Sequence, residues 1–462
     1  MRSIKYSLIN ALVLGIPITS FAQKAETPPN ILIIMADDLD SRQISCYGGQ
    51  NIKTPNIDAL AKRGLKFGNL FCSEAMCVPI RASLFTGLYP ARHGSFQNHK
   101  KVYPETEAIG KYLADLGYTV ALTGKDHSTK PESIFRFKMI PGFENNCVAP
   151  TANYTVDSIK EFMTNNIKPF CLFVMSTNPH APWTVGDPSA FDPQKLVLPQ
   201  HWVDTREGRT EFCKYLAEVR ALDNQVGDVV SALKSTGKEN NTLILFLGEQ
   251  GPQMPGGKWT LYDYGIKSAM IAVLPGITPK GTISKAMVQY EDITPTLIEI
   301  ADGKPIAKLD GKSFLSVIKG NTDIHRDYVY GIHNNIPEGT AYPIRSIRDS
   351  KYKLVANLMF GSTYYLKWTM NPLKLSIIWG SWLQASKNSK NAKTMVDRIL
   401  KHPEYELYDT ENDPYELNNL IEKPELKKVV DDLKENLDEW MNQQKDPGKA
   451  LDDAALRKKA GR

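Results

Sequence analysis

The stretch NILIIMADD, residues 30–38, decides the fold, because its apolar and β-branched run ends at two adjacent acids. Such a run, without alternating polar side chains, is typical of a strand buried on both faces of a mostly parallel sheet. A second strand of this kind is indicated by TLILFL at 242–247, which is followed by Glu249 and Gln250. Ligands of open α/β sheets bind outside the carboxyl ends of the strands, so both strand ends are candidate site positions.

Strands and helices alternate around these two runs. The helix expected at 54–64 begins with Thr as its N-cap and Pro at its first position. Further helices are expected at 107–116 and 211–233, and further strands at 118–122, 170–175 and 270–274. This alternation predicts an α/β domain with a large mixed, mostly parallel sheet flanked by helices.

The pattern changes after residue 325. Short segments suited to a small antiparallel sheet lie at 328–332, 344–347, 351–355 and 406–409, and an amphipathic helix is expected at 425–441. We therefore predict a catalytic domain over 23–325 and a smaller α+β subdomain with a short antiparallel sheet over 326–462. The stretch 368–382 fits either a helix or a loop that shapes the substrate cleft.

The N-terminus is typical of an exported protein. Arg2 and Lys5 precede an apolar stretch from about 8 to 21, which predicts a cleaved signal peptide at 1–22 and a periplasmic or secreted location. An anchor helix is disfavoured because the stretch is short and interrupted by Pro17. We expect no membrane association after cleavage. The formal net charge of +5 is too mild to suggest nucleic-acid binding.

The six cysteines match no zinc pattern and no small disulfide scaffold. In an oxidising compartment some of them could pair. They are Cys46, Cys72, Cys77, Cys147, Cys171 and Cys213.

Oxygen ligands at the two strand ends suit a hard cation such as calcium or magnesium. Asp37 and Asp38 end the first strand, and Glu249 and Gln250 follow the second. Taken alone, an Asp-Asp pair is more often a helix cap or a turn; two oxygen-rich strand ends make a metal site an equal alternative.

The segment CVPIRASLFTG, residues 77–87, resembles the signature of the sulfatase family. In that signature Cys-x-Pro-x-Arg opens a helix and runs into Ala-Ser-Leu-(Leu/Phe)-Thr-Gly, and a maturation enzyme oxidises the cysteine to formylglycine. A lone cysteine before a helix would ordinarily be a buried core thiol. The agreement over eleven residues, in the expected place relative to Asp37 and Asp38, favours the family instead.

Other segments resemble the family in the same order. Lys125 and His127 lie in a segment that would stand beside the formylglycine, His180 lies in an Asn-Pro-His-Ala-Pro turn, and Lys258 follows the second strand end. Within the family, residues 30 to 445 resemble the sulfamidase (heparan N-sulfatase) branch. The segments that carry this likeness are 257–262, 292–297, 342–346, 406–409 and 413–416.

The resemblance implies an alkaline-phosphatase-like fold and a sulfate-removing hydrolase. A hydrated formylglycine made from Cys77 would attack sulfur, beside one calcium ion. The implied metal ligands are Asp37, Asp38, Cys77, Glu249 and Gln250. The resemblance also implies that Arg81 and Lys125 stabilise the nucleophile and that His180 and Lys258 bind the sulfate. It implies that His180 protonates the leaving group and that His127 removes a proton.

The implied substrate is a sulfated glycan, first N-sulfoglucosamine or another sulfated amino sugar of heparin or heparan sulfate. An O-sulfate on another polysaccharide remains open, because the same machinery serves both bonds. His333, Asn334 and Asn335 could contact the sugar, although a polar loop is the simpler interpretation.

Two departures from the family pattern leave a further alternative. Glu249 and Gln250 are each one methylene longer than the residues usual there, and Ile80 replaces a Ser or Ala. They keep open a pseudosulfatase that binds sulfated glycans without cleaving them. A metal phosphatase or phosphodiesterase of the same fold is disfavoured, because it would use a Ser or Thr nucleophile and His/Asp zinc ligands.

Overall fold

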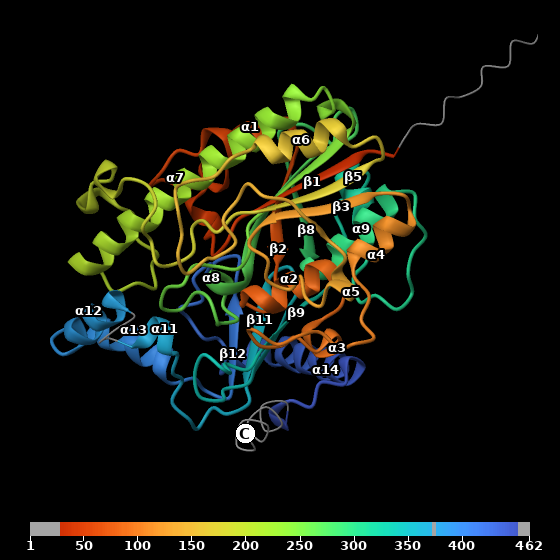
Figure 1. Ribbon diagram of the computed structural model, residues 1–462. Helices are drawn as coiled ribbons and strands as arrows, with labels where there is room; N and C mark the ends of the chain where they lie inside the picture. The colour runs from red at the N-terminus through yellow and green to blue at the C-terminus, as the bar shows by residue number, and fades with distance from the viewer. Residues whose placement is uncertain (1–27, 372–375, 451–462) are drawn as a thin grey trace, which may run out of the picture.

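The computed structural model describes residues 28–371 and 376–450, so the predicted signal peptide at 1–22 lies outside the described residues. Figure 1 shows a large sheet with helices on both sides and a smaller sheet near the C-terminal end of the chain. The expected fold class is confirmed. The domain boundary placed at 325/326 stays a prediction.

The large sheet has eight strands in the order β4-β3-β5-β1-β6-β7-β2-β8. The run that decides the fold forms β1, which pairs in parallel with β5 on one side and β6 on the other. Among the described strands of this sheet, β7 alone runs antiparallel to its neighbours. The strands are β1 (Asn30–Met35), β2 (Leu65–Phe71), β3 (Thr119–Gly124), β4 (Lys138–Met139), β5 (Phe170–Met175), β6 (Thr242–Leu247), β7 (Lys267–Val273) and β8 (Thr282–Gln289).

Helices cover both faces of this sheet (Figure 1). One group packs around the longest helix, α7 (Arg206–Ser235), and contains α1 (Pro55–Arg63) and α6 (Asp157–Asn165). The other group contains α2 (Cys77–Thr86), α4 (Ile109–Asp115) and α9 (Ile293–Ile300), which contact one another. Short helices complete this part: α3 (Pro90–His93), α5 (Glu132–Phe135), α8 (Asp263–Ile266) and α10 (Leu315–Ile318).

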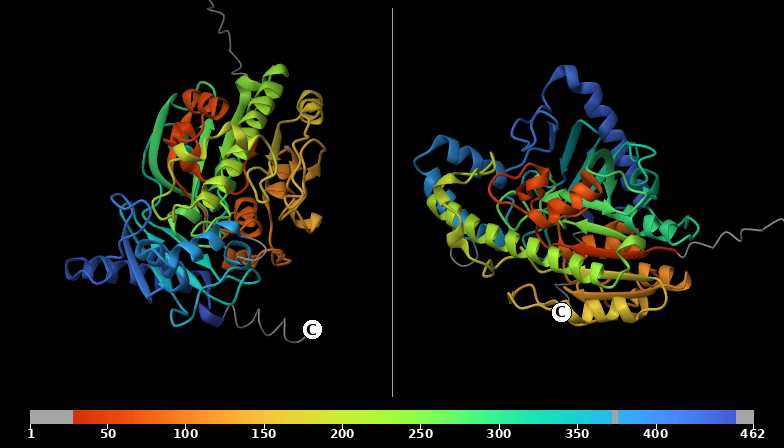
Figure 2. Two further views of the ribbon diagram at one scale, coloured as in Figure 1. Left: turned by 90° about the vertical axis from the view of Figure 1, so that its left-hand side faces the viewer. Right: turned by 90° about the horizontal axis from the view of Figure 1, so that it is seen from above.

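The small sheet is antiparallel throughout, in the order β12-β11-β10-β9. Helix α14 (Lys427–Gln444) packs on it through a buried stripe that includes Leu433, Leu437 and Trp440. Figure 2 shows these C-terminal elements, in blue, gathered at one side of the molecule. The strands are β9 (Val329–His333), β10 (Ile344–Arg348), β11 (Tyr352–Asn357) and β12 (Tyr405–Asp409).

The stretch left open between helix and loop, 368–382, contains parts of two helices. Helix α11 (Lys367–Met370) is a single turn. Ser376 is the N-cap of α12 (Ile377–Ser386), because its side-chain oxygen accepts a hydrogen bond from the backbone N–H of Trp379. Helix α12 packs against α7 and is followed by α13 (Lys390–Leu400).

The two sheets are joined directly. The backbone N–H of Ile332 in β9 donates to the carbonyl of Ser73, just after β2, at 2.7 Å. The described helices include none that is both long and apolar enough for a bilayer span. All six cysteines are free thiols, so the expected possibility of pairing is not realised among them.

Candidate functional site

The two predicted strand ends meet, because β1 and β6 are neighbours in the sheet. Asp37 and Asp38 are fully buried after β1, and Glu249 and Gln250 are fully buried after β6. Asp38 has a left-handed backbone, with φ at 58°, and its carbonyl accepts a hydrogen bond from Tyr215 at 3.2 Å. A non-glycine residue held in this region by its surroundings is common at functional sites.

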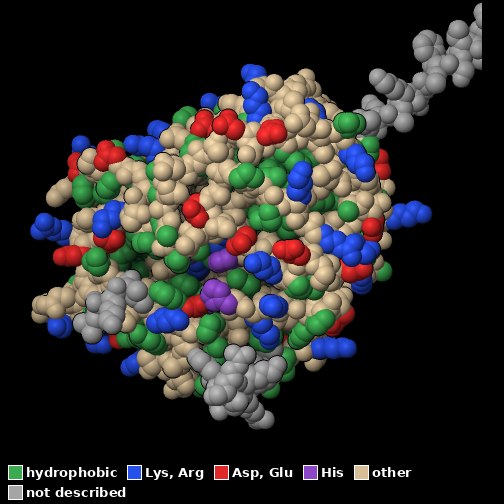
Figure 3. Space-filling view, in the orientation of Figure 1, with side chains coloured by type: hydrophobic (Ala, Val, Ile, Leu, Met, Phe, Trp, Pro, Cys, Tyr) green, Lys and Arg blue, Asp and Glu red, His purple; other side chains and the backbone are tan. Residues whose placement is uncertain are grey.

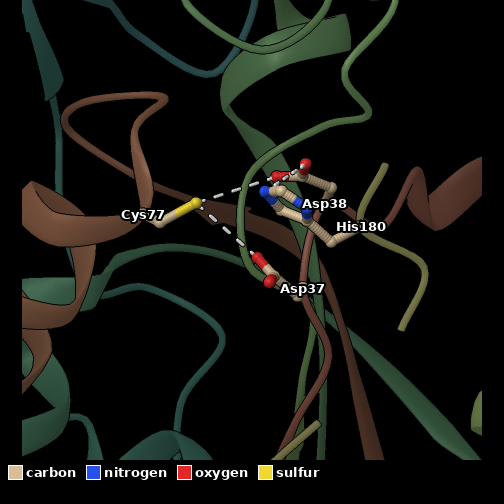
Figure 4. Close-up of side chains that lie close together, drawn as sticks. All are labelled: Asp37, Asp38, Cys77 and His180. Atoms are coloured by element: carbon tan, nitrogen blue, oxygen red, sulfur yellow. Dashed lines mark hydrogen bonds and ion pairs between the residues drawn. The ribbon is translucent and has the colours of Figure 1, made fainter. Parts of the chain in front are cut away.

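Cys77 begins α2 and points at these acids (Figure 4). Its Sγ lies 3.6 Å from Oδ1 of Asp37 and 4.0 Å from Oδ1 of Asp38. The side-chain amide of Gln250 donates to the same sulfur at 3.2 Å. Cys77 is 2% exposed, and Ile80, one turn along α2, is completely buried.

Three buried cations face three buried carboxylates. Lys125 Nζ lies 2.5 Å from Asp37, Lys258 Nζ 2.8 Å from Asp38, and Arg81 Nε 2.6 Å from Glu249. Each pair satisfies charges that would be very costly to bury alone.

These pairs also shift the acid–base behaviour of the thiol. Burial and Glu249 raise the pKa of Cys77, but Lys125, Lys258 and the neighbouring His127 bring it well below its usual range. Burial lowers the pKa of Lys125, but Asp37 and Cys77 raise it above its usual range. The site therefore stabilises negative charge at position 77.

Two histidines flank Cys77. The ring of His180 lies with Nε2 3.6 Å from Asp38, and its Nδ1 contacts the carbonyl of Ala181 at 2.5 Å. Burial lowers the pKa of His180, but Asp38 raises it well above its usual range. His127 also interacts with Cys77, and both histidines interact with the thiol of Cys147.

The carboxylate oxygens at this site suit a hard cation. Ligand atoms of Asp37, Asp38, Cys77 and His180 lie within 4.8 Å of one another and are all buried. The side-chain carbonyl oxygen of Gln250 is buried without a hydrogen-bond partner. Carboxylate and amide oxygens are ligands that calcium accepts. The amide nitrogen of Gln250 is the atom that contacts the carboxylates here, donating to Asp38 at 2.5 Å and to Glu249 at 2.9 Å. Glu249 instead lies against Arg81 and outside that group of four, so its part in binding a metal stays a prediction.

A pocket of about 860 Å³ opens above these residues. In Figure 3, histidine side chains (purple) reach the surface near the centre of the face, among basic and apolar side chains. Four of the predicted site residues line the pocket: Cys77, His127, His180 and Lys258. The others lie beneath them, completely buried: Asp37, Asp38, Arg81, Lys125, Glu249 and Gln250.

Several lining residues were not predicted from the sequence. Cys147 comes from a loop after β4; burial raises the pKa of its thiol, but Lys125, His127 and His180 bring it down to about 4. Asn98, Glu338 and Trp368 come from three separate loops or short helices. Nothing in the local sequence marks Asn98 or Glu338, whereas Trp368 begins the stretch 368–382, for which a loop that shapes the substrate cleft is one of the two expectations.

The residues considered for sugar contact behave differently. His333, Asn334 and Asn335 are completely buried and do not line the pocket. The Asn334 amide donates to the carbonyl of Phe96, and the Asn335 amide donates to that of Tyr365. They support the loop that carries Glu338, in agreement with the simpler interpretation of a polar loop.

A nucleophile-bearing helix, strand-end carboxylates and buried cations at one edge of an α/β sheet define a hydrolase of anionic esters. The chain belongs to the sulfatase family, whose model matches residues 29–303. The C-terminal model of N-sulphoglucosamine sulphohydrolase matches residues 257–373, in agreement with the predicted branch. The protein is therefore an enzyme, a sulfatase.

Related proteins and solved structures agree with this family assignment. An ulvan-active sulfatase of Formosa agariphila is 32% identical over 90% of this chain and 81% of its own length. Human N-sulphoglucosamine sulphohydrolase is 26% identical over 94% of this chain and 93% of its own. A structure solved in complex with its substrate D-glucosamine-2-N,6-O-disulfate superposes with a TM-score of 0.71 and 20% identity, covering 91% of this chain and 99% of that one; this likeness shows the fold.

Proposed function

We propose that this sulfatase removes sulfate from a sulfated glycan, first N-sulfoglucosamine or another sulfated amino sugar of heparin or heparan sulfate. The proposal includes a formylglycine made from Cys77 by a maturation enzyme, one bound calcium ion, and export to the periplasm or the medium. One observation carries it: Cys77 lies at the floor of a pocket, between two buried acids and three buried cations. The match to the N-sulphoglucosamine sulphohydrolase C-terminal family supports the amino sugar.

The absent groups would supply two things: a hydrated aldehyde offers an oxygen nucleophile for sulfur, and calcium offers positive charge to sulfate oxygens. Asp37, Asp38 and Gln250 would hold the ion, with Glu249 as a further candidate. Lys125 and Arg81 keep the floor of the site positive, and burial strengthens their effect because little water screens them. Lys258, which lines the pocket, would bind the sulfate.

His180 and His127 are the residues that would transfer protons. His180 directs Nδ1 at a backbone carbonyl, so this nitrogen is the donor there. The raised pKa of His180, caused by Asp38 against the effect of burial, keeps a second proton on Nε2. That nitrogen can protonate the leaving oxygen or nitrogen of the sugar. His127, which also interacts with residue 77, would take the proton that releases sulfate.

The first experiment measures the peptide mass across Cys77 after co-expression with a maturation enzyme, with Cys77→Ala as the control. The mass loss of thiol-to-aldehyde conversion, together with calcium-dependent sulfate release from glucosamine N-sulfate, is the expected result. An unmodified thiol would mean that Ile80 blocks processing. That outcome would favour a protein that binds sulfated glycans without cleaving them.

A second candidate is an O-sulfatase of another polysaccharide. It is favoured by the 32% identity to an ulvan-active sulfatase. Sulfate release from ulvan oligosaccharides, with none from glucosamine N-sulfate, would select it.

A further inference from the structure

Part of the pocket wall is not used by the proposed chemistry. Beyond the four residues at its catalytic end, its wall includes Asn98, Glu338 and Trp368. Glu338 and Trp368 follow β9 and β11 in the chain, whereas Cys77 belongs to the part built on the large sheet. The site is therefore completed by side chains from both parts.

Glu338 is a buried carboxylate, 4% exposed, in the wall of this pocket. The Asn98 amide donates to its Oε1 at 3.2 Å. Its Oε2 accepts from the indole N–H of Trp368 and lies 3.4 Å from Nζ of Lys367. A carboxylate can accept about four hydrogen bonds, so Oε1 keeps a free lone pair.

Asn98 ties Glu338 to the catalytic helix. Its Oδ1 accepts from the backbone N–H of Val78, the residue after Cys77, at 3.4 Å. Only one side chain thus separates the carboxylate from the start of α2. A sugar whose sulfate reaches Cys77 would have its ring beside Glu338.

Trp368 is held in place beside Glu338. Its indole N–H is fixed by Glu338, and Lys367 Nζ lies 4.9 Å from the centre of its ring. The side chain is half-buried and lines the pocket. A fixed aromatic face with one polar tip offers a large apolar contact at little cost in side-chain entropy.

We propose that Glu338 and Trp368 form the sugar-binding half of the site. Trp368 contacts the apolar face of the sulfated sugar, and Glu338 accepts a hydrogen bond from a hydroxyl or amino group of the ring. Because a carboxylate repels another carboxylate, Glu338 selects a neutral or amino sugar over a uronic acid. This inference rests on the proposed function, since it places the sulfate of the same substrate at Cys77.

Binding to Cys77→Ala protein tests the proposal without requiring turnover. The probes are inorganic sulfate, glucosamine N-sulfate and glucuronic acid 2-sulfate, each titrated by calorimetry. We expect glucosamine N-sulfate to bind at least about ten-fold more tightly than the uronate, as a hydrogen bond to a charged group allows. Glu338→Gln should reduce that preference several-fold, and Trp368→Ala should weaken both sugars more than inorganic sulfate. Glu161→Gln, on the exposed side of α6, is the control.

Two results would overturn the proposal. One is a loss of inorganic sulfate binding in Glu338→Gln as large as the loss of sugar binding, which would mean that Glu338 only supports α2 through Asn98. The other is binding of both sugars no tighter than inorganic sulfate. If the expected binding pattern holds but mature wild-type protein releases no sulfate, the sugar subsite stands and the proposed function fails.

Discussion

At the scale of single residues, breaking the buried pair of Arg81 and Glu249 should cost far more stability than breaking a surface pair of equal length. Both Arg81–Glu249 and Arg63–Glu239 have a contact of 2.6 Å, but the first pair is 0% exposed and the second is 40% and 18% exposed. Glu249→Ala leaves a guanidinium buried without its partner, which costs about 3–5 kcal/mol. Glu239→Ala should cost at most about 1 kcal/mol.

Denaturant unfolding of the two variants measures this difference in the free energy of unfolding. Equal losses would show that the Arg81 charge is compensated by other groups. The carbonyl of Lys125, which accepts from Arg81 at 3.4 Å, and the charge of Asp37 are such groups.

The sequence predicts this site well where the motif is local. Asp37, Cys77 and Arg81 are all positioned by elements that their own neighbours define, a buried strand and a helix that begins at Cys77. Cys147, Glu338 and Trp368 are not predictable in this way. They reach the pocket through long connections, and only the tertiary arrangement brings them to Cys77.

At the scale of elements, substitutions of two glycines near strand β3 measure separately the cost of a left-handed backbone and the cost of a steric clash. Gly117, before the strand, and Gly124, at its end, have φ values of +86° and +88°. A Cβ at Gly117 would meet nothing within 4 Å, whereas a Cβ at Gly124 would lie 2.0 Å from the carbonyl oxygen of Met175. That same oxygen accepts from the backbone N–H of Lys125 at 2.8 Å.

We expect Gly117→Ala to cost about 1–2 kcal/mol, from the left-handed backbone alone. Gly124→Ala should cost about 2–5 kcal/mol, because overpacking is added, and it should also lower sulfatase activity by displacing Lys125. Thermal unfolding and initial rates measure the two effects. Similar unfolding temperatures for both variants would contradict the steric account.

Each departure from the predicted elements has a local physical cause. Strand β2 reads LKFGNLF, where Gly68 and Asn69 weaken strand propensity, and its register shifts at that point. Strand β8 is exposed at its first residues and has no clear alternation. Helix α7 begins at Arg206 instead of the expected 211, because the side chain of Thr205 caps it by accepting from the N–H of Gly208.

At the scale of the whole molecule, the junction between the two sheets contains an acid with a strong pH effect. Glu291 follows β8, is completely buried, and accepts from the hydroxyl of Ser73, whose carbonyl binds β9. Burial raises the pKa of Glu291 from 4.5 to about 7, although Ser73 lowers it. The folded state therefore holds this proton more tightly than the unfolded state. The stability that the proton contributes is full below pH 4.5 and is lost as the pH rises through 7.

Glu291→Gln keeps the shape and cannot ionise. The difference in the free energy of unfolding, Glu291→Gln minus wild type, should be about 1–3 kcal/mol larger at pH 8 than at pH 4.5. Urea unfolding at both pH values measures the change, with exposed Glu299→Gln as the control. A difference between Glu291→Gln and wild type that does not vary with pH would disprove the assignment.

The same junction contains a buried group of two acids and two cations that links both parts of the molecule. Asp263, in α8, contacts Arg348 of β10 at 2.8 Å and Lys353 of β11 at 2.6 Å, and Lys353 also contacts Glu416 at 2.5 Å. Lys353→Met leaves two buried carboxylates with one cation and should cost about 3–5 kcal/mol.

Lys353→Met with Glu416→Gln restores one acid to one cation, so the double variant should be more stable than the single one. A double-mutant cycle by urea unfolding measures this coupling. If the two losses simply add, the contribution of Glu416 to stability does not depend on Lys353.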